Sequence, residues 1–271
     1  MKKTVVAICY DFDKTLATND MQAFRFIPNL GMTEAEFWKK RTEFSEKHNA
    51  DPTLSFMLLM LDECNKRGIK LTKKYLNDMG KDIRFFDGVL TWFKRINAYA
   101  ESRGVKLEHY LISTGNREII EGCPIYKEFK IVYGSEYLYG KDGVAYWPKN
   151  IVNYTLKTQH LFRICKGVTS LKDEMGVNER VTKKHVEFRN MVYIGDGYTD
   201  VPCMTLVKEK GGTAIAVYPK GKDLVSKKLL EDDRVNFICE SDYSANSALE
   251  KLMKLIIDTC ELKDRLAKQK Q

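Results

Sequence analysis

Two pairs of aspartates at the ends of apolar segments are the residues best suited to do chemistry in this sequence. Asp11 and Asp13 lie in the segment YDFDKTL, directly after the apolar run TVVAIC. Asp196 and Asp200 lie in the segment GDGYTD, directly after the apolar run NMVYI. Short continuous apolar runs are typical of strands buried on both faces of a parallel sheet. Because ligands bind beyond the carboxyl ends of such strands, we expect the four carboxylates at one site.

Carboxylates gathered in this way can share one divalent cation. Along an extended segment side chains alternate, so Asp11 and Asp13 point to one side while Phe12 points away into the core. Adjacent like charges repel, and a nearby cation relieves that repulsion. Mg²⁺ is a hard cation that takes oxygen ligands and keeps several waters. The residue types therefore predict a Mg²⁺ site.

Further positions offer groups that could bind a phosphoryl oxygen. A strand predicted at 109–112 ends in Ser113 and Thr114, and a hydroxyl beside a following helix start can donate to such an oxygen. Lys157 lies in the first turn of a helix predicted at 155–167, where a cation opposes the helix dipole unless anions lie near it. A solvated surface lysine remains the alternative for this position.

In their order along the chain these segments resemble the motifs of the haloacid dehalogenase superfamily of phosphotransferases and phosphohydrolases. The matching segments are DFDKTL, LISTG, the lysine and GDGYTD. An ordered set of four motifs is far more specific than any one of them. The resemblance implies an α/β fold, with a three-layer α/β/α Rossmann-like core around a parallel sheet, and Mg²⁺-dependent phosphate chemistry.

The resemblance also implies a role for each acidic residue. Asp11 would be the nucleophile that forms an aspartyl-phosphate, and Asp13 would be the general acid and base. The metal would be held by Asp11, the backbone carbonyl of Asp13 and Asp196. Asp200 would orient either a water on the metal or Lys157.

Substrate contacts follow from the same resemblance. Ser113 would bind phosphoryl oxygens together with the lysine, Thr114 is its alternative, and Thr15 would steady the loop. Asp20 lies nine residues after the first aspartate, where phosphoserine-phosphatase-like members tend to place a glutamate of the cap. No arginine occurs at 54–57 to grip a substrate carboxylate, so the resemblance does not extend to phosphoserine as the substrate.

The lysine and the reaction type each keep alternatives. Lys149 and Lys166 are the fallbacks for Lys157, because its distance in sequence from the last motif is longer than we expect. An acid at Asp13 favours a phosphatase or a phosphomutase over a dehalogenase or an ion-pumping ATPase. We expect a phosphohydrolase acting on a small phosphorylated metabolite. A phosphomutase is the alternative, and a non-catalytic phosphometabolite-binding protein is less favoured.

The segment 17–86 has helical patterns throughout, with Thr33 and Thr72 as predicted N-caps. By resemblance it is a small all-helical cap inserted after the first strand, over a catalytic core formed by 1–16 and 87–271. Such a cap would act as a lid that excludes water and selects the substrate. Sequence alone does not separate the packing surface of the cap from its substrate surface.

Apolar residues at helical spacing are assigned to packing. Met57, Met60 and Trp38 are expected in the core rather than at a ligand site. A helix predicted at 89–100 places Leu90 on its buried face. The rest of the chain is predicted to form a strand at 130–133, a hairpin at 136–147, a polar surface excursion at 168–185, strands at 213–217 and 235–239, and a helix at 247–266.

Composition is that of an ordinary folded protein. The chain has 271 residues, of which 44% are hydrophobic and 30% charged, and no apolar stretch approaches the roughly 18 residues of a membrane span. The net charge of +8 arises from basic residues interleaved with acids, so we expect no nucleic-acid partner and no membrane partner. Seven scattered cysteines without a C-x-x-C pair indicate a reducing cytoplasm.

Overall fold

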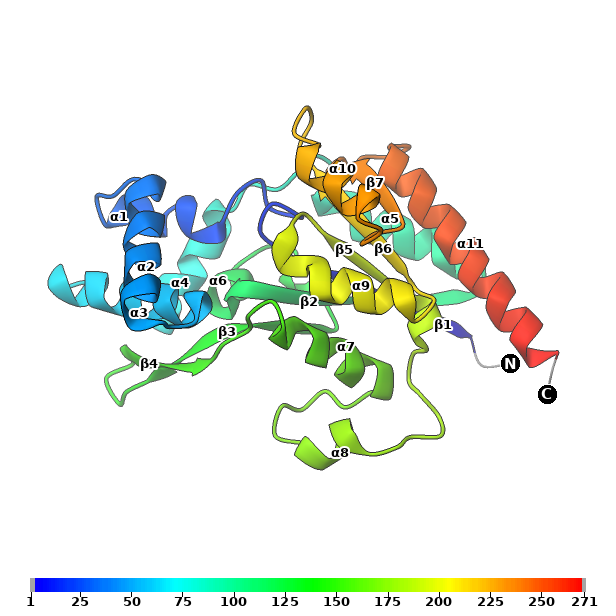
Figure 1. The fold of residues 1–271 in the computed structure, drawn as a ribbon, viewed down its shortest axis with the longest axis horizontal. Coiled ribbons are helices and arrows are strands. Elements are labelled where there is room, and N and C mark those ends of the chain that lie inside the picture. Colours follow the sequence, from blue (N-terminus) through cyan, green and yellow to red (C-terminus); the bar gives the residue numbers. More distant parts are fainter. Residues whose placement is uncertain (1–2, 270–271) are drawn as a thin grey trace.

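The computed structural model describes residues 3–269, and a seven-stranded sheet forms its centre (Figure 1). The strands run in the order β4-β3-β2-β1-β5-β6-β7, and every neighbouring pair is parallel except β3 and β4. The strands are β1 (Thr4–Tyr10), β2 (Val105–Asn116), β3 (Ile131–Tyr139), β4 (Ala145–Asn150), β5 (Met191–Gly195), β6 (Thr213–Tyr218) and β7 (Phe237–Glu240). The predicted α/β class with a parallel sheet is confirmed.

Helices cover both faces of this sheet. Side chains of β1 alternate between two apolar clusters, so that Val6 and Ile8 pack on one face while Ala7 and Cys9 pack on the other. The first face is covered by α5 (Val89–Ser102) and α11 (Ala248–Lys268). The second face is covered by α7 (Leu156–Lys166), α9 (Val201–Glu209) and α10 (Leu224–Glu231). The result is the three-layer arrangement that the sequence predicts.

The chain between β1 and α5 is helical, and it lies at the end of the sheet next to β3 and β4 (Figure 1). Thr33 accepts a hydrogen bond from the Glu36 backbone N–H, and Thr72 accepts one from the Tyr75 N–H, as expected for N-caps. The elements here are η1 (Met21–Ala23), α1 (Phe26–Asn29), α2 (Glu34–His48), α3 (Pro52–Lys66), α4 (Lys73–Met79) and η2 (Gly80–Asp82).

Two adjacent chain crossings join this helical segment to the sheet. The Thr18 N–H donates to the Arg84 carbonyl at 2.9 Å, and the Phe86 N–H donates to the Leu16 carbonyl at 3.0 Å. The segment is also attached to the β3–β4 hairpin, because the Tyr137 hydroxyl donates to the Met57 carbonyl at 2.9 Å. The helices are therefore fixed against the sheet edge as well as tethered at the crossings.

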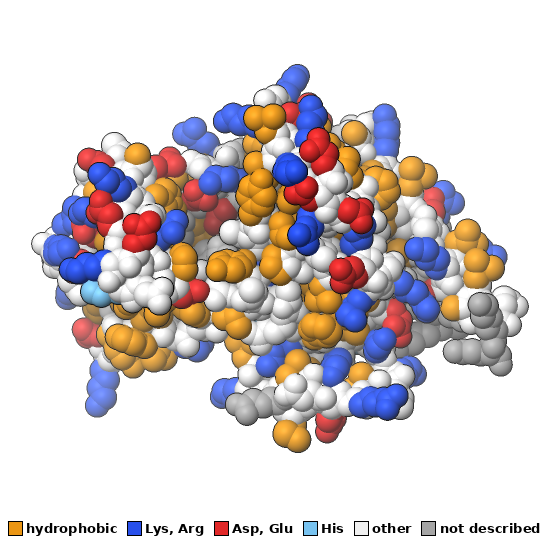
Figure 2. All heavy atoms as spheres, in the orientation of Figure 1, with side chains coloured by type: hydrophobic (Ala, Val, Ile, Leu, Met, Phe, Trp, Pro, Cys, Tyr) orange, Lys and Arg blue, Asp and Glu red, His pale blue; other side chains and the backbone are white. Residues whose placement is uncertain are grey.

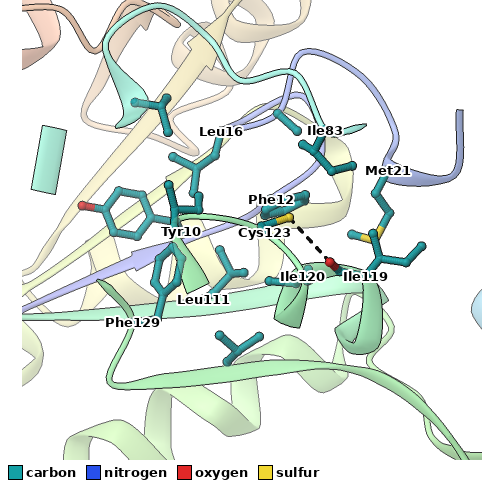
Figure 3. Packing of buried hydrophobic residues seen from close by; sticks show 14 of the residues in the cluster. Tyr10, Phe12, Leu16, Met21, Ile83, Leu111, Ile119, Ile120, Cys123 and Phe129 are labelled. Carbon is teal, nitrogen blue, oxygen red and sulfur yellow. Dashed lines mark hydrogen bonds between the residues drawn. The ribbon is translucent and has the colours of Figure 1, made fainter. Parts of the chain in front are cut away.

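Close to these crossings, the core around the first aspartate motif holds Phe12 in place. Its ring is fully buried, and it lies with Leu16, Ile83 and Cys123 in one apolar cluster (Figure 3). The prediction that Phe12 points into the core is confirmed. Because Phe12 is held in this way, the carboxyl groups on either side of it are directed out of the apolar core.

The remaining helical elements are short connections. They are α6 (Arg117–Glu121), η3 (Tyr126–Glu128), α8 (Glu174–Asn178), η4 (Phe188–Asn190) and η5 (Tyr198–Asp200). The predicted surface excursion at 168–185 contains α8, and Arg163 attaches it to α7 by donating to the Ser170 carbonyl at 2.7 Å.

Three packing details differ from the sequence expectations. Leu90 is 64% exposed, because the buried face of α5 is formed by Val89 and Trp92 with the residues one turn later. The strand expected at 130–133 and the first arm of the hairpin are one continuous strand, β3, which pairs with β2 along one part and with β4 along another. Met57 and Met60 are fully buried as expected, whereas Trp38 packs against the same core but stays partly exposed.

Surface charge and cysteine state agree with the composition. Figure 2 shows basic and acidic side chains interspersed over the visible face, without a separate basic stripe. All seven cysteines are unpaired and buried. Among residues 3–269, no helix combines the length and the apolar character needed to cross a bilayer.

Candidate active site

The ends of β1 and β5 bring three of the four aspartates together. These strands are neighbours, and the Asp11 N–H donates to the Ile194 carbonyl at 2.9 Å. As a consequence, Asp11, Asp196 and Asp200 each present a carboxylate oxygen within 4.8 Å of the others. Segments that are far apart in sequence thus converge where the sheet topology predicts a ligand site.

Lys157 joins this acidic group from the first turn of α7. Its Nζ donates to Asp11 Oδ1 and to Asp200 Oδ1, both at 2.7 Å, and its side chain is fully buried. The two fallback lysines lie elsewhere: Lys149 pairs with a glutamate of the β3–β4 hairpin, and Lys166 donates to backbone carbonyls near α8. Of the three candidates, Lys157 is the lysine that contacts the aspartates.

Burial and mutual repulsion make it unfavourable for all carboxylates of this group to be ionised at once. Burial and the repulsion from Asp200 raise the pKa of Asp11 to about 7, although the Lys157 ammonium opposes that change. Burial, followed by repulsion from Asp200 and Asp11, raises the pKa of Asp196 to about 8. Burial disfavours the charge of Lys157, but the two carboxylates beside it outweigh burial and raise its pKa. A second cation would relieve the remaining repulsion.

Both carboxylate oxygens of Asp200 accept hydrogen bonds from the protein. Its Oδ1 also accepts from the Tyr193 hydroxyl at 2.7 Å, and its Oδ2 accepts from the Asp196 N–H at 3.2 Å. Gly195 leaves the room for this arrangement, since a Cβ built there would lie 2.3 Å from Asp200 Oδ2. Asp200 therefore orients Lys157 and the turn that carries Asp196.

Asp13 lies to one side of this group and faces a pocket. Its Oδ1 accepts from the Met21 N–H at 2.8 Å. Loss of hydration, then repulsion from Asp20 and Asp11, raises the pKa of Asp13 well above its usual value. Asp20 pairs with Lys14 at 2.8 Å, and Lys14 holds a left-handed backbone conformation with φ of 56°. A protonated Asp13 beside a carboxylate-rich centre can act as an acid.

The hydroxyl candidates occupy different depths. Ser113 is fully buried, and its Oγ accepts from the Gly115 N–H at 3.0 Å, which leaves the hydroxyl proton available as a donor. Thr114 lines the pocket together with Asp13. Thr15 is fully buried, and its hydroxyl lies 3.5 Å from Asp196 Oδ1, so it links the two aspartate loops.

The pocket has a volume of about 520 Å³ and is lined by residues of the helical segment and of the sheet. The lining residues that sequence reasoning did not assign to a site include Lys14, Trp38, Arg41 and Tyr154. Lys14 could have been identified from the sequence, because it lies inside the motif DFDKTL. Trp38 and Arg41 share one face of α2. No sequence pattern distinguishes them from ordinary core or surface residues, because only the tertiary structure shows that this face lines the pocket.

The donor set fits Mg²⁺. Asp11, Asp196 and Asp200 offer carboxylate oxygens within 4.8 Å of one another, and this cation prefers oxygen ligands over nitrogen or sulfur. The raised pKa values of Asp11 and Asp196 describe two carboxylates that lack a sufficient counter-charge. A divalent cation between them would supply it.

Comparisons with known proteins give one relative in sequence. No family model matches the chain. An uncharacterized protein of Borreliella burgdorferi is 26% identical to it, over 92% of this chain and 95% of that protein.

Several solved structures share the architecture. A hydrolase of the HAD family from Salmonella enterica serovar Typhi superposes with a TM-score of 0.59 at 19% identity, over 92% of this chain and 70% of that one. A substrate-bound phosphoserine phosphatase gives 0.55 at 16% identity, over 94% and 99% of the two chains. A probable phosphoserine phosphatase from Vibrio cholerae gives 0.57 at 13% identity, over 99% and 67%. The chain therefore has the fold of haloacid dehalogenase hydrolases and phosphoserine phosphatases.

Proposed function

We propose that this chain, which has that fold, is a Mg²⁺-dependent phosphohydrolase of the haloacid dehalogenase superfamily, in its phosphoserine-phosphatase-like subgroup. It removes the phosphoryl group of a small phosphorylated metabolite through an aspartyl-phosphate. The observation that supports this best is the convergence of Asp11, Asp196 and Asp200 around the buried Lys157, next to a pocket that Asp13 lines.

Asp11 is the nucleophile of the first step. Lys157 holds its Oδ1, so the other carboxylate oxygen attacks phosphorus, forms the new P–O bond and displaces the alcohol oxygen with inversion. Asp13, protonated because its pKa is raised, gives its proton to that leaving oxygen. The products of this step are the free alcohol and a phosphorylated Asp11.

Asp13 acts in the opposite direction in the second step. As a carboxylate it takes a proton from a water molecule, which attacks phosphorus and breaks the bond to Asp11. Inorganic phosphate leaves, and Asp13 is protonated again for the next turnover. One residue serves both steps because it lies on the side where first the alcohol and then the water must be.

The phosphoryl oxygens are bound by Lys157 and by the Ser113 hydroxyl, with Thr114 as the alternative hydroxyl. Mg²⁺, held by Asp11, Asp196 and the backbone carbonyl of Asp13, would neutralise the repulsion between carboxylate and phosphate. Asp200 keeps Lys157 in place. These groups surround the phosphoryl group with positive charge and hydrogen-bond donors.

The helical segment 17–86 serves as a cap over a core made of 1–16 and 87–271. The pocket between them receives the leaving group and limits the access of water. The seven unpaired cysteines support a reducing compartment such as the cytoplasm.

Phosphate release from a panel of small phosphate monoesters, with Mg²⁺ and with EDTA, tests the proposal. We expect turnover that depends on Mg²⁺, and we expect Asp11→Asn to lower kcat by at least about 10³-fold. The matched control is Asp62→Asn, which removes an exposed carboxylate of α3 that pairs with Lys66. Near-normal turnover by a folded Asp11→Asn protein would refute the nucleophile. Isomerisation of a sugar phosphate without free phosphate would indicate a phosphomutase.

A further inference from the structure

The pocket beside Asp13 must receive the leaving group, because Asp13 protonates the leaving oxygen in the proposed reaction. Its volume of about 520 Å³ is within the usual range for small-molecule sites. The residues that line this pocket should therefore complement the alcohol part of the substrate.

The polar groups of these walls are largely paired with one another. The Asp20 carboxylate accepts from Lys14 at 2.8 Å, and the buried Gln22 amide donates to Asn116 Oδ1 at 3.0 Å. A charged leaving group would have to separate Lys14 from Asp20 to bind to either of these two side chains. Breaking such contacts reduces the gain from binding.

Aromatic side chains form the other part of the walls. Trp38 comes from α2, Phe56 from α3 and Tyr154 from the turn before α7. The side chain of Tyr154 is 44% exposed, and it makes no hydrogen bond within residues 3–269. Phe56 is buried and packs edge-on against Trp38, with ring centroids 6.3 Å apart, so the partly exposed Trp38 and the exposed Tyr154 offer the ring surface that a ligand ring could cover.

A flat cation extends this aromatic surface. The Arg41 guanidinium lies 5.7 Å from the centroid of the Trp38 ring, in the range of a cation–π contact. Arg41 also lines the pocket, and it forms no ion pair with any residue of the described chain. Guanidinium planes stack on rings, so Arg41 adds a further face for a planar group.

We propose that the substrate is a phosphomonoester whose alcohol carries an aromatic ring, bound against Trp38, Phe56 and Tyr154. The inference rests on the proposed phosphohydrolase function and adds the chemical class of its leaving group. Asp13 then lies at the junction between the phosphoryl centre and the ring-binding part of the pocket.

The test compares benzyl phosphate with propyl phosphate in the presence of Mg²⁺. Both leaving groups are primary alkoxides, so the ratio of their kcat/KM values reports recognition of the ring more than intrinsic reactivity. We expect the wild-type protein to prefer benzyl phosphate by about tenfold or more. A ratio near one, or a preference for propyl phosphate, would overturn the inference and leave the phosphohydrolase standing.

Two variants locate the preference. Trp38→Ala and Tyr154→Ala should each lower the benzyl-to-propyl ratio by about fivefold. The matched controls Trp147→Ala and Tyr146→Ala remove exposed aromatic rings of β4 outside the pocket, and they should leave the ratio unchanged. Tyr154 is a surface residue, so its variant remains informative even where Trp38→Ala fails to fold. An unchanged ratio in Tyr154→Ala and in folded Trp38→Ala would contradict the assignment.

Binding of phosphonates that are not hydrolysed tests the ring site independently of the proposed phosphohydrolase activity. Benzylphosphonate and propylphosphonate are not hydrolysed, and calorimetry gives their Kd values without turnover. Tighter binding of benzylphosphonate, lost in Tyr154→Ala, supports the ring site even if neither phosphate ester is hydrolysed. Absence of turnover alone contradicts the phosphohydrolase, whereas equal Kd values contradict the ring site.

Discussion

At the scale of single residues, Asp11 and Asp13 differ in their neighbours, and the difference separates their roles. Burial and Asp200 raise the pKa of Asp11 to about 7, and the hydrogen bond from the buried Lys157 ammonium opposes that rise. Burial, followed by repulsion from Asp20 and Asp11, favours the protonated form of Asp13, and the hydrogen bond from the Met21 N–H opposes this effect. In the proposed reaction, these different surroundings suit Asp11 to attack phosphorus and Asp13 to donate a proton.

If Asp13 is the general acid, the loss of kcat in the Asp13→Asn variant should depend on the leaving group of the substrate. We expect its kcat for propyl phosphate to fall by about 10²- to 10⁴-fold, because the departing alkoxide needs a proton. With 4-nitrophenyl phosphate, whose leaving group is stable without protonation, formation of the phosphorylated Asp11 should be much less affected. Stopped-flow release of nitrophenolate measures that first step. Equal losses with both substrates would remove Asp13 from the role of acid.

Lys157 also has a structural role, since it is the cation between two buried carboxylates. Replacing it in Lys157→Met leaves Asp11 and Asp200 without that partner, and we expect the free energy of unfolding at pH 7 to fall by about 3–5 kcal/mol. Adding Asp200→Asn should restore part of this loss because it removes one uncompensated charge. Urea unfolding of the single and double variants measures both effects. A fully additive cost of the two changes would contradict this coupling.

At the scale of elements, Asn153 positions Lys157 by starting α7. Its side-chain Oδ1 accepts from the Leu156 N–H at 2.9 Å, and its carbonyl accepts from the Lys157 N–H at 3.0 Å. Its Nδ2 also donates to Asp51 Oδ2 at 2.9 Å, and Asp51 caps α3. One asparagine therefore connects the helical segment, the start of α7 and the buried lysine.

We expect Asn153→Ala to affect activity more than a simple loss of a helix cap does. The cap itself contributes about 1 kcal/mol to the free energy of unfolding. The matched control is Ser247→Ala, which removes the N-cap of α11 far along the chain from Lys157. Both variants should lose similar stability, but only Asn153→Ala should lower kcat, by about tenfold. Equal kcat values in the two variants would show that α7 keeps Lys157 in place without Asn153.

For the molecule as a whole, we expect the acidic centre to couple stability to pH and to Mg²⁺. The pKa values of Asp11 and Asp196 are raised to about 7 and about 8, so without metal the folded state binds more protons than the unfolded state above about pH 4. Stability of the metal-free protein should therefore fall as pH rises from about 4 to 8. Deprotonated carboxylates bind Mg²⁺, so its affinity should rise over the upper part of this range.

Thermal unfolding with EDTA and with Mg²⁺ at pH 6 and pH 8 tests this coupling. Mg²⁺ at 100 times its Kd should add about 2.7 kcal/mol to the free energy of unfolding. Asp196→Asn should remove most of the Mg²⁺ response, and at pH 8 it should stabilise the metal-free protein by about 1–2 kcal/mol. Asp62→Asn, a surface change, should retain the wild-type behaviour. A Mg²⁺ response that persists in Asp196→Asn would place the metal elsewhere.

Features that depend on neighbouring residues could be predicted from the amino-acid sequence. Apolar runs followed by aspartates predicted β1 and β5 with the loops that follow them, and Thr33 and Thr72 marked the starts of two helices. The glycine-rich turn predicted the hairpin of β3 and β4. Local patterns succeed here because strand burial, capping and turn formation are decided by residues within a few positions of one another.

Only the tertiary structure decided which distant groups meet. It showed which of three lysines contacts the aspartates, Lys157, and it placed Trp38 both against the core and at the wall of a pocket. It also brought Asp11 and Asp196 from β1 and β5 to one point. Periodicity shows which face of an element is apolar but not what packs opposite it, and the carboxylates meet only because the sheet places those two strands side by side.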